Sequence, residues 1–183
     1  MGSFYAATLY PKENTEDVKN ILEGKNFYLC SKDDGYRLVT EEKMDEQNPA
    51  EIKKFTRELS SKTDKSVISY MIHDSDVLYF IIYKNGKEIF VIDNEEEYFN
   101  DGEFIRKEKE NIPSIFGIDE TRWKTETCME KFEECTFADD FLLSLLKILK
   151  LPDWVCGIGY RYLEEDATLK SALQKDGIEI HKR

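Results

Sequence analysis

The chain has 183 residues, of which 40% are hydrophobic and 13% aromatic, and this apolar content excludes a disordered protein although 35% of the residues are charged. The length fits a single domain with its own core. Acidic residues outnumber basic ones by 38 to 26, so the net charge is −12. Such a surface repels phosphates and disfavours direct binding of nucleic acid, whereas it favours rapid association with basic proteins.

No segment of the sequence has the composition of a membrane span. The longest apolar run, Phe141 to Leu146, is interrupted by Ser144 and is much shorter than a bilayer requires. The first residues lack the basic stretch followed by an apolar stretch that marks a secretory signal. We therefore expect a cytoplasmic protein that does not contact membranes.

The cysteine pattern does not indicate a metal site. Structural zinc sites use closely spaced ligand pairs such as CxxC, which this sequence does not contain, and the chain has only two histidines. The four cysteines are predicted to be reduced and mostly buried thiols: Cys30, Cys128, Cys135 and Cys156. No cofactor is predicted.

The first half of the chain alternates between strand-like and helix-like patterns. The predicted elements, in order, are a strand at 3–10, a helix at 16–23 capped by Asn14 or Thr15, strands at 26–30 and 36–40, a charged connection at 41–47 without periodicity, and a second helix that begins at Pro49. The second helix has the clearest start signal, because Asn48 caps it, Pro49 takes its first position and Glu51 lies three residues after the cap.

Residues 66–93 predict a three-stranded meander at the centre of the sheet. The dipeptide Asn85-Gly86 favours a type I′ turn, so residues 79–84 and 87–93 are expected to pair directly. Both faces of the strand at 77–83 are apolar, which indicates a strand covered on both sides.

The second half predicts helices. Asn94 is expected to cap a short helical turn, Trp123 and Phe132 lie in helix-compatible stretches, and Thr136 is expected to cap an apolar helix that ends before Pro152. A turn is predicted at 157–160.

These elements predict an α+β domain with an antiparallel sheet built from two βαββ-like units, helices packed on one face, and a C-terminal helical segment. The expected parts of this single domain (1–183) are a sheet with two helices at 1–99, a charged loop at 100–114, a helical part at 115–166 and a polar tail at 167–183.

One group of residues has the composition of a catalytic or metal site. His73, Asp74 and Asp76 offer an imidazole and two carboxylates, which suits a divalent cation and a metal-assisted hydrolase or nucleotide-processing enzyme. The same segment, with Ser75, is also typical of a turn between strands, and in an extended chain His73 projects away from the two aspartates. The turn is the interpretation we favour, and with it binding over catalysis.

Clusters of acidic and aromatic residues are the candidate partner-binding surface. Carboxylates attract a basic partner, and tyrosines beside them can anchor the interface. The candidate residues are Glu95, Glu96, Glu97, Tyr98, Tyr160, Tyr162, Glu164, Glu165 and Asp166.

The motifs HDSDVLYFIIYKNGKEIF, EEYF, FADDFLLSLLKILKLP and GYRYLEED together resemble a group of uncharacterised bacterial proteins with an HDSDVL strand and a GYxYL tail. The resemblance covers about residues 66–166 and departs at Lys150, where that group tends to have glycine. It implies no catalytic residues. In its small size and acidity the chain is similar to the immunity proteins of bacterial toxin systems, which is a likeness of character and not of motif.

The sequence therefore favours a non-enzymatic, acidic protein-binding module, an immunity-type or inhibitory partner of a basic protein. It does not predict the oligomeric state.

Overall fold

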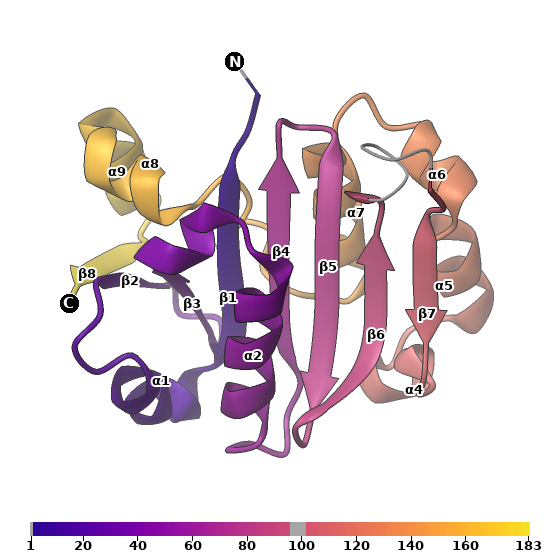
Figure 1. The fold of residues 1–183 in the computed structure, drawn as a ribbon, viewed down its shortest axis with the longest axis horizontal. Coiled ribbons are helices and arrows are strands. Elements are labelled where there is room, and N and C mark those ends of the chain that lie inside the picture. The colour runs from indigo at the N-terminus through magenta and orange to yellow at the C-terminus, as the bar shows by residue number, and fades with distance from the viewer. Residues whose placement is uncertain (1, 96–101) are drawn as a thin grey trace.

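The computed structural model describes residues 2–95 and 102–183 and has the α+β architecture predicted from the sequence. Within these residues one antiparallel sheet of eight strands has the order β7-β6-β5-β4-β1-β3-β2-β8 (Figure 1). The strands are β1 Tyr5–Pro11, β2 Phe27–Ser31, β3 Tyr36–Glu41, β4 Val67–His73, β5 Val77–Lys84, β6 Lys87–Asp93, β7 Ile105–Glu108 and β8 Glu179–Lys182. The first strand, β1, lies between β3 and β4, so the sheet extends outward on both sides of it.

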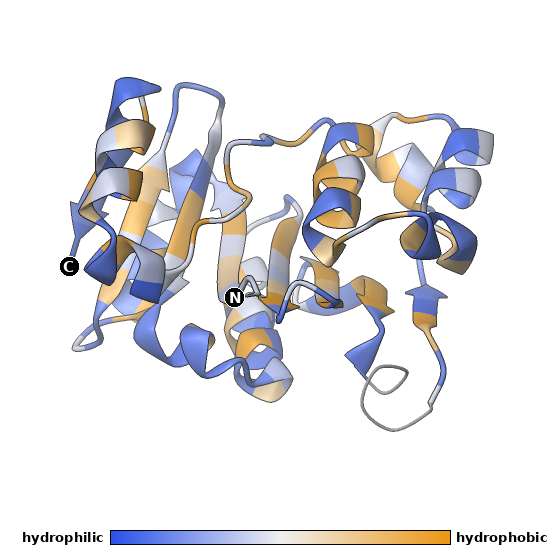
Figure 2. Cartoon of the chain, turned by 90° about the horizontal axis from the view of Figure 1, so that it is seen from above, coloured by the Kyte–Doolittle hydropathy of each residue, from blue (hydrophilic) through white to orange (hydrophobic). Residues whose placement is uncertain are grey.

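Helices cover both faces of this sheet. In Figure 1, α1 and α2 lie in front of the sheet and α5 and α7 lie behind it, and Figure 2 shows the same layers from above. The described helices are the 3-10 helices η1 Lys12–Asn14 and η2 Glu42–Glu46, and the α-helices α1 Thr15–Ile21, α2 Pro49–Ser60, α4 Ile112–Phe116, α5 Glu120–Glu126, α6 Met129–Glu133, α7 Ala138–Ile148, α8 Tyr160–Glu165 and α9 Ala167–Lys175. The two helices of the N-terminal half share one face, as predicted, and the C-terminal helical segment covers the other.

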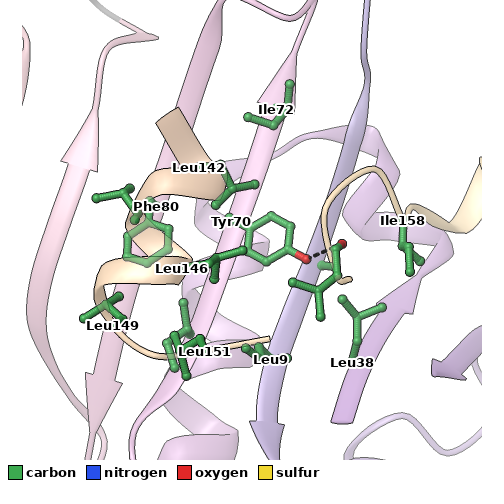
Figure 3. Close-up of a cluster of buried hydrophobic side chains, with 14 of the residues drawn as sticks. Leu9, Leu38, Tyr70, Ile72, Phe80, Leu142, Leu146, Leu149, Leu151 and Ile158 are labelled. Carbon is green, nitrogen blue, oxygen red and sulfur yellow. Dashed lines mark hydrogen bonds between the residues drawn. The ribbon is translucent and has the colours of Figure 1, made fainter. Parts of the chain in front are cut away.

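The sheet separates two hydrophobic clusters because successive side chains of a strand point to opposite faces. The larger cluster lies between the sheet and the C-terminal helices, and Tyr70 of β4 is at its centre. The Tyr70 side chain is fully buried among leucines of α7 and β1, and its hydroxyl donates a hydrogen bond to the Val155 carbonyl at 2.9 Å (Figure 3). The smaller cluster lies under α1 and α2. Strand β5 contributes to both clusters, so the prediction that this strand is covered on both sides is confirmed.

The central hairpin and the start of α2 are also confirmed. Strands β5 and β6 pair from Tyr79 with Asp93 to Lys84 with Lys87, and the turn residues Asn85 and Gly86 have φ angles of 50° and 71°. Two positive φ angles are what a type I′ turn requires. At the start of α2, the Asn48 side chain accepts a hydrogen bond from the Ala50 amide at 2.9 Å.

Several segments differ from the sequence-based expectation. The expected loop at 100–114 contains β7, which pairs with β6, and the first residues of α4. The expected polar tail at 167–183 folds into α9 and into β8, which pairs with β2. The charged connection expected at 41–47 contains η2. The helix expected to be capped by Thr136 begins at Ala138, whose amide donates to the Ser75 carbonyl at 2.7 Å. The helical turn expected after Asn94 falls mostly outside the described residues.

Among residues 2–95 and 102–183, no helix combines the length and apolar composition that a bilayer crossing requires.

A buried carboxylate on β6 predicts a loss of stability at low pH. Glu88 has a side chain only 11% exposed, and it contacts Lys53 of α2 at 2.9 Å and Lys109 at 2.6 Å. Burial alone would raise the pKa of Glu88, but hydrogen bonds and charges from the two lysines outweigh burial and lower it. Because the folded-state pKa lies below the unfolded value, this stabilisation is complete above the unfolded pKa and is lost as the pH falls through the folded pKa.

We therefore expect Glu88→Gln to lower the free energy of unfolding by about 1 kcal/mol at pH 7, since the lysines are half-exposed and screened by water. The difference from wild type should shrink as the pH falls below the usual glutamate range. Urea denaturation at a series of pH values measures both the loss of unfolding free energy and its dependence on pH. Glu120→Gln, which removes a pair with Lys124 at a site 61% exposed, is the control and should cost less than about 0.5 kcal/mol. A loss of unfolding free energy in Glu88→Gln that does not change with pH would contradict the stabilising role of the ionised Glu88 side chain.

Candidate functional site

The segment His73-Asp74-Ser75-Asp76 forms the turn between β4 and β5. Asp74 and Ser75 have φ angles of 50° and 65°, and the Asp76 amide donates to the His73 carbonyl at 3.2 Å. Ser75 also anchors the turn to the start of the chain, because its hydroxyl accepts a hydrogen bond from the Ser3 amide at 2.7 Å and its amide donates to the Ser3 carbonyl at 3.2 Å. With the bond from Ala138, this turn joins the chain start, the β4–β5 hairpin and α7.

His73 contacts Gln47 and Phe4. The Nδ1 atom of His73 shares a hydrogen bond of 2.5 Å with the side-chain oxygen of Gln47. The side-chain nitrogen of Gln47, Nε2, donates to the Ile72 carbonyl at 2.7 Å. The ring of Phe4 lies edge-on to the imidazole, with 4.9 Å between centroids. Gln47 itself has a left-handed backbone, with φ at 56°. These contacts orient the imidazole toward Gln47.

In the part of the chain that the structure describes, no three histidine, cysteine, aspartate or glutamate side chains are arranged to share a metal ion. The residues of the metal hypothesis, His73, Asp74 and Asp76, thus do not form a ligand set of that size among the described residues. Of the four cysteines, which form no disulfide, only Cys30 is fully buried, and burial raises the pKa of its thiol to about 12.

Most of the candidate interface residues in α8 make internal contacts. The Tyr162 hydroxyl accepts a hydrogen bond from the Phe4 amide at 2.7 Å, and the Tyr160 ring, 8% exposed, lies 5.5 Å from that of Tyr28. Glu164 accepts a hydrogen bond from the Tyr28 hydroxyl at 2.7 Å and also pairs with Lys182.

Asp166 caps α9. Its side chain accepts hydrogen bonds from the amides of Thr168 and Leu169 at 2.8 and 3.0 Å, which satisfies free N–H groups at a helix start. Glu165, by contrast, is exposed. Of the other predicted group, Glu95 is half-buried and its amide donates to the Asp93 carboxylate at 2.9 Å, while Glu96, Glu97 and Tyr98 lie outside the described residues.

The structure brings Glu165 together with carboxylates that the sequence interpretation missed. Helices η2 and α8 line an open hollow of about 470 Å³, which we call the acidic hollow; it contains Glu42, Asp45, Glu46, Tyr160, Arg161, Glu164 and Glu165. The signal in the sequence is the i, i+3 spacing of Glu42 and Asp45, which places both on one side of a 3-10 helix, with Glu46 next to Asp45. The charge of residues 41–47 instead predicts a connection without periodicity, and the structure places η2 there.

Two close contacts fix the geometry of the acidic hollow. Asp45 accepts a hydrogen bond from the Arg161 amide at 2.5 Å and so caps the first turn of α8. Burial raises the pKa of Asp45 above its usual value. The second contact is at Gly159, where a Cβ atom would lie 2.6 Å from the Cβ of Tyr5. Only glycine lets α8 approach β1 this closely, and this approach sets α8 beside η2.

Comparison of the chain with protein-family models, with curated protein sequences and with solved structures gave no match.

Proposed function

We propose that this protein is a non-enzymatic, cytoplasmic binding module that associates with a basic protein, in the manner of an immunity-type or inhibitory partner. The observation that carries the proposal is the acidic hollow. Five carboxylate side chains line it, from η2 and α8, beside a single cation, Arg161. In a chain with a net charge of −12, this arrangement favours rapid, oriented encounter with a positively charged surface.

The carboxylates of the hollow differ in how far they are available to a partner. Glu164 is engaged with Tyr28 and Lys182, and Asp45 caps α8. Glu46 and Glu165 are exposed, and Glu42 is exposed while accepting one hydrogen bond from the Asn26 side chain at 2.9 Å. These three residues are the proposed points of contact, and the engaged carboxylates keep the hollow in shape.

The proposal is tested by affinity purification of the tagged protein from its own cell at low and at high salt. We expect a basic protein to co-purify at low salt and to be released at high salt, because exposed charges are screened. A variant that combines Glu42→Gln, Glu46→Gln and Glu165→Gln should bind that protein about tenfold more weakly in a titration of the purified components.

The matched control removes the same charge from exposed positions elsewhere, with Glu23→Gln, Glu51→Gln and Glu58→Gln. We expect this control to retain nearly the wild-type affinity. Equal weakening by both triple variants would mean that only the overall charge matters and that the acidic hollow is not the contact surface. Recovery of no protein partner at either salt concentration would contradict the proposed function.

A further inference from the structure

A second hollow collects positively charged side chains, although the chain as a whole is strongly acidic. It has a volume of about 220 Å³ and we call it the cationic pocket; Lys19, Leu29, Arg37, Glu179, His181 and Arg183 line it. Its wall is α1, and its floor is formed by β3, β2 and the edge strand β8. In Figure 1 these elements lie together at the left end of the sheet, with α1 in front.

The pairing of β8 with β2 explains why distant cations converge here. Ile180 packs into the larger hydrophobic cluster and Lys182 reaches Glu164, so both point to the far face of the sheet. The alternating residues Glu179, His181 and Arg183 therefore point to the face that carries α1. His181 lies opposite Leu29, which places an apolar side chain on the floor between the charged groups.

Arg37 is the central residue of the cationic pocket. It lies between Tyr10 of β1 and Ser31 of β2, its register partners, and it is half-buried. Within the described residues its guanidinium makes no ion pair or hydrogen bond, although it carries five N–H donors. The half-buried Arg106 shows the usual arrangement, because its guanidinium bonds to Thr127 and Glu108 at 3.0 Å each.

A buried hydroxyl, that of Tyr10, lies beside Arg37. The side chain of Tyr10 is fully buried close to Thr15 and Arg37, and its hydroxyl makes no hydrogen bond of good geometry within the described residues. Burial raises the pKa of Tyr10 to about 12, so the hydroxyl keeps its proton at neutral pH and can donate it to an acceptor.

The charge of the pocket is positive. Its lining side chains include three cations, Lys19, Arg37 and Arg183, and one acidic group, Glu179. Lys19 also pairs with Glu16 at 2.5 Å, and Glu179 accepts a hydrogen bond from the Ser31 hydroxyl at 3.5 Å. A neighbouring hollow of about 280 Å³ shares Ser31, Arg37 and Glu179 with the cationic pocket and adds two lysines and one aspartate: Lys12, Lys32 and Asp33. Arg37 thus lies where two cation-lined hollows meet.

We propose that the cationic pocket binds the phosphate group of a small phosphomonoester of about the size of a sugar phosphate. The planar guanidinium of Arg37 can donate hydrogen bonds to two phosphate oxygens at once, and the Lys19 ammonium adds a second positive charge. A phosphomonoester carries close to two negative charges at neutral pH, so several cations around one site suit it. Leu29 offers an apolar floor for the rest of the molecule. The volume, and a lining that contains no phenylalanine, tyrosine or tryptophan, favour a sugar over a nucleoside. The site uses different residues from the acidic hollow and is independent of the proposed partner.

Isothermal titration with glucose 6-phosphate, inorganic phosphate and glucose tests the proposal. We expect glucose 6-phosphate to bind about tenfold more tightly than inorganic phosphate, and glucose not to bind. Arg37→Gln should weaken binding of the ester by about tenfold, and Glu179→Gln should strengthen it several-fold, because one repulsive charge is removed. Lys147→Gln, which removes an exposed cation from α7, is the control and should leave the affinity unchanged.

The variants also separate binding from folding. Since the Arg37 guanidinium makes no ion pair or hydrogen bond with the described residues, Arg37→Gln should keep the wild-type melting temperature within about 2 °C. A gain of affinity in Glu179→Gln has no explanation in misfolding. The proposal is overturned if none of the phosphates binds at about 10 mM, which corresponds to a very weak interaction, or if Arg37→Gln and Lys147→Gln have the same effect. Equal affinity for inorganic phosphate and the ester would overturn the assignment of a phosphomonoester.

Discussion

Replacing Trp123 by alanine is expected to lower the free energy of unfolding by about 3–5 kcal/mol. The Trp123 side chain on α5 is fully buried, its ring lies 4.9 Å from that of Phe90 on β6, and the guanidinium of Arg106 lies over it. Alanine leaves a cavity at the junction between the C-terminal helices and the edge of the sheet. Urea denaturation followed by circular dichroism measures the loss.

The Trp123 indole also belongs to a polar network, so part of the expected loss is not packing. Its Nε1 atom donates to Glu108 at 3.0 Å, and the same carboxylate oxygen accepts from Arg106 at 3.0 Å. Trp123→Phe keeps an aromatic ring near Phe90 and removes the donor, and we expect this variant to cost about 1–2 kcal/mol. The difference between the two variants then reports the packing contribution.

The other tryptophan of the chain provides the matched control. Trp154 is half-buried and its indole bonds to Asp34, so Trp154→Ala should cost about 1–2 kcal/mol. Each variant retains one tryptophan as a fluorescence probe of unfolding. A loss in Trp123→Ala no larger than in Trp154→Ala would mean that the contact of α5 with the sheet contributes little to stability.

The sequence predicts the central sheet because its signals there are local. Asn85-Gly86 specifies a type I′ turn through the φ angles of two adjacent residues, and Asn48 caps α2 through a bond to an amide two residues away. Apolar side chains on both faces of β5 indicate two covering layers without any knowledge of which helices form them. These interactions link residues that are close in the chain.

The edges of the sheet were wrongly predicted because their charged residues have distant partners. Arg106 and Glu108 lie in a charged segment that resembles a loop, yet in β7 they bond to each other and to α5. Edge strands carry more charge than central strands, since one side has no neighbouring strand and charge there opposes unwanted pairing. High charge therefore did not distinguish an edge strand from a loop.

The candidate sites were less predictable than the fold. The acidic hollow depends on Gly159 bringing α8 to η2, a contact between segments more than a hundred residues apart. The cationic pocket is not visible as a basic run, because its cations come from α1, from β3 and from the residue that follows β8. The HDSD segment, by contrast, is a turn whose local residue types predict it well.

Deleting residues 167–183 is expected to remove about 3–6 kcal/mol of stability from the burial of Leu173 and Ile178 alone. These side chains are 9% and 2% exposed in the larger hydrophobic cluster. The deletion also removes β8 from the edge of β2 and so exposes Tyr28 and Cys30. Because small domains have a total stability of about 5–15 kcal/mol, the shortened protein should unfold at or near room temperature. Thermal denaturation followed by circular dichroism measures this.

Point variants test whether the loss of stability comes from the lost burial of side chains and not from the shorter chain. Ile178→Ala should lower the free energy of unfolding by about 2–5 kcal/mol because it leaves a cavity under β8. The paired control Gln174→Ala with Lys175→Ala changes exposed residues of α9 and should cost less than about 0.5 kcal/mol. A deleted protein that melts within about 2 °C of the full chain would show that α9 and β8 do not stabilise the sheet. Because β8 carries His181 into the cationic pocket and Arg183 directly follows it, the docking of β8 is a condition for that site as well as for the fold.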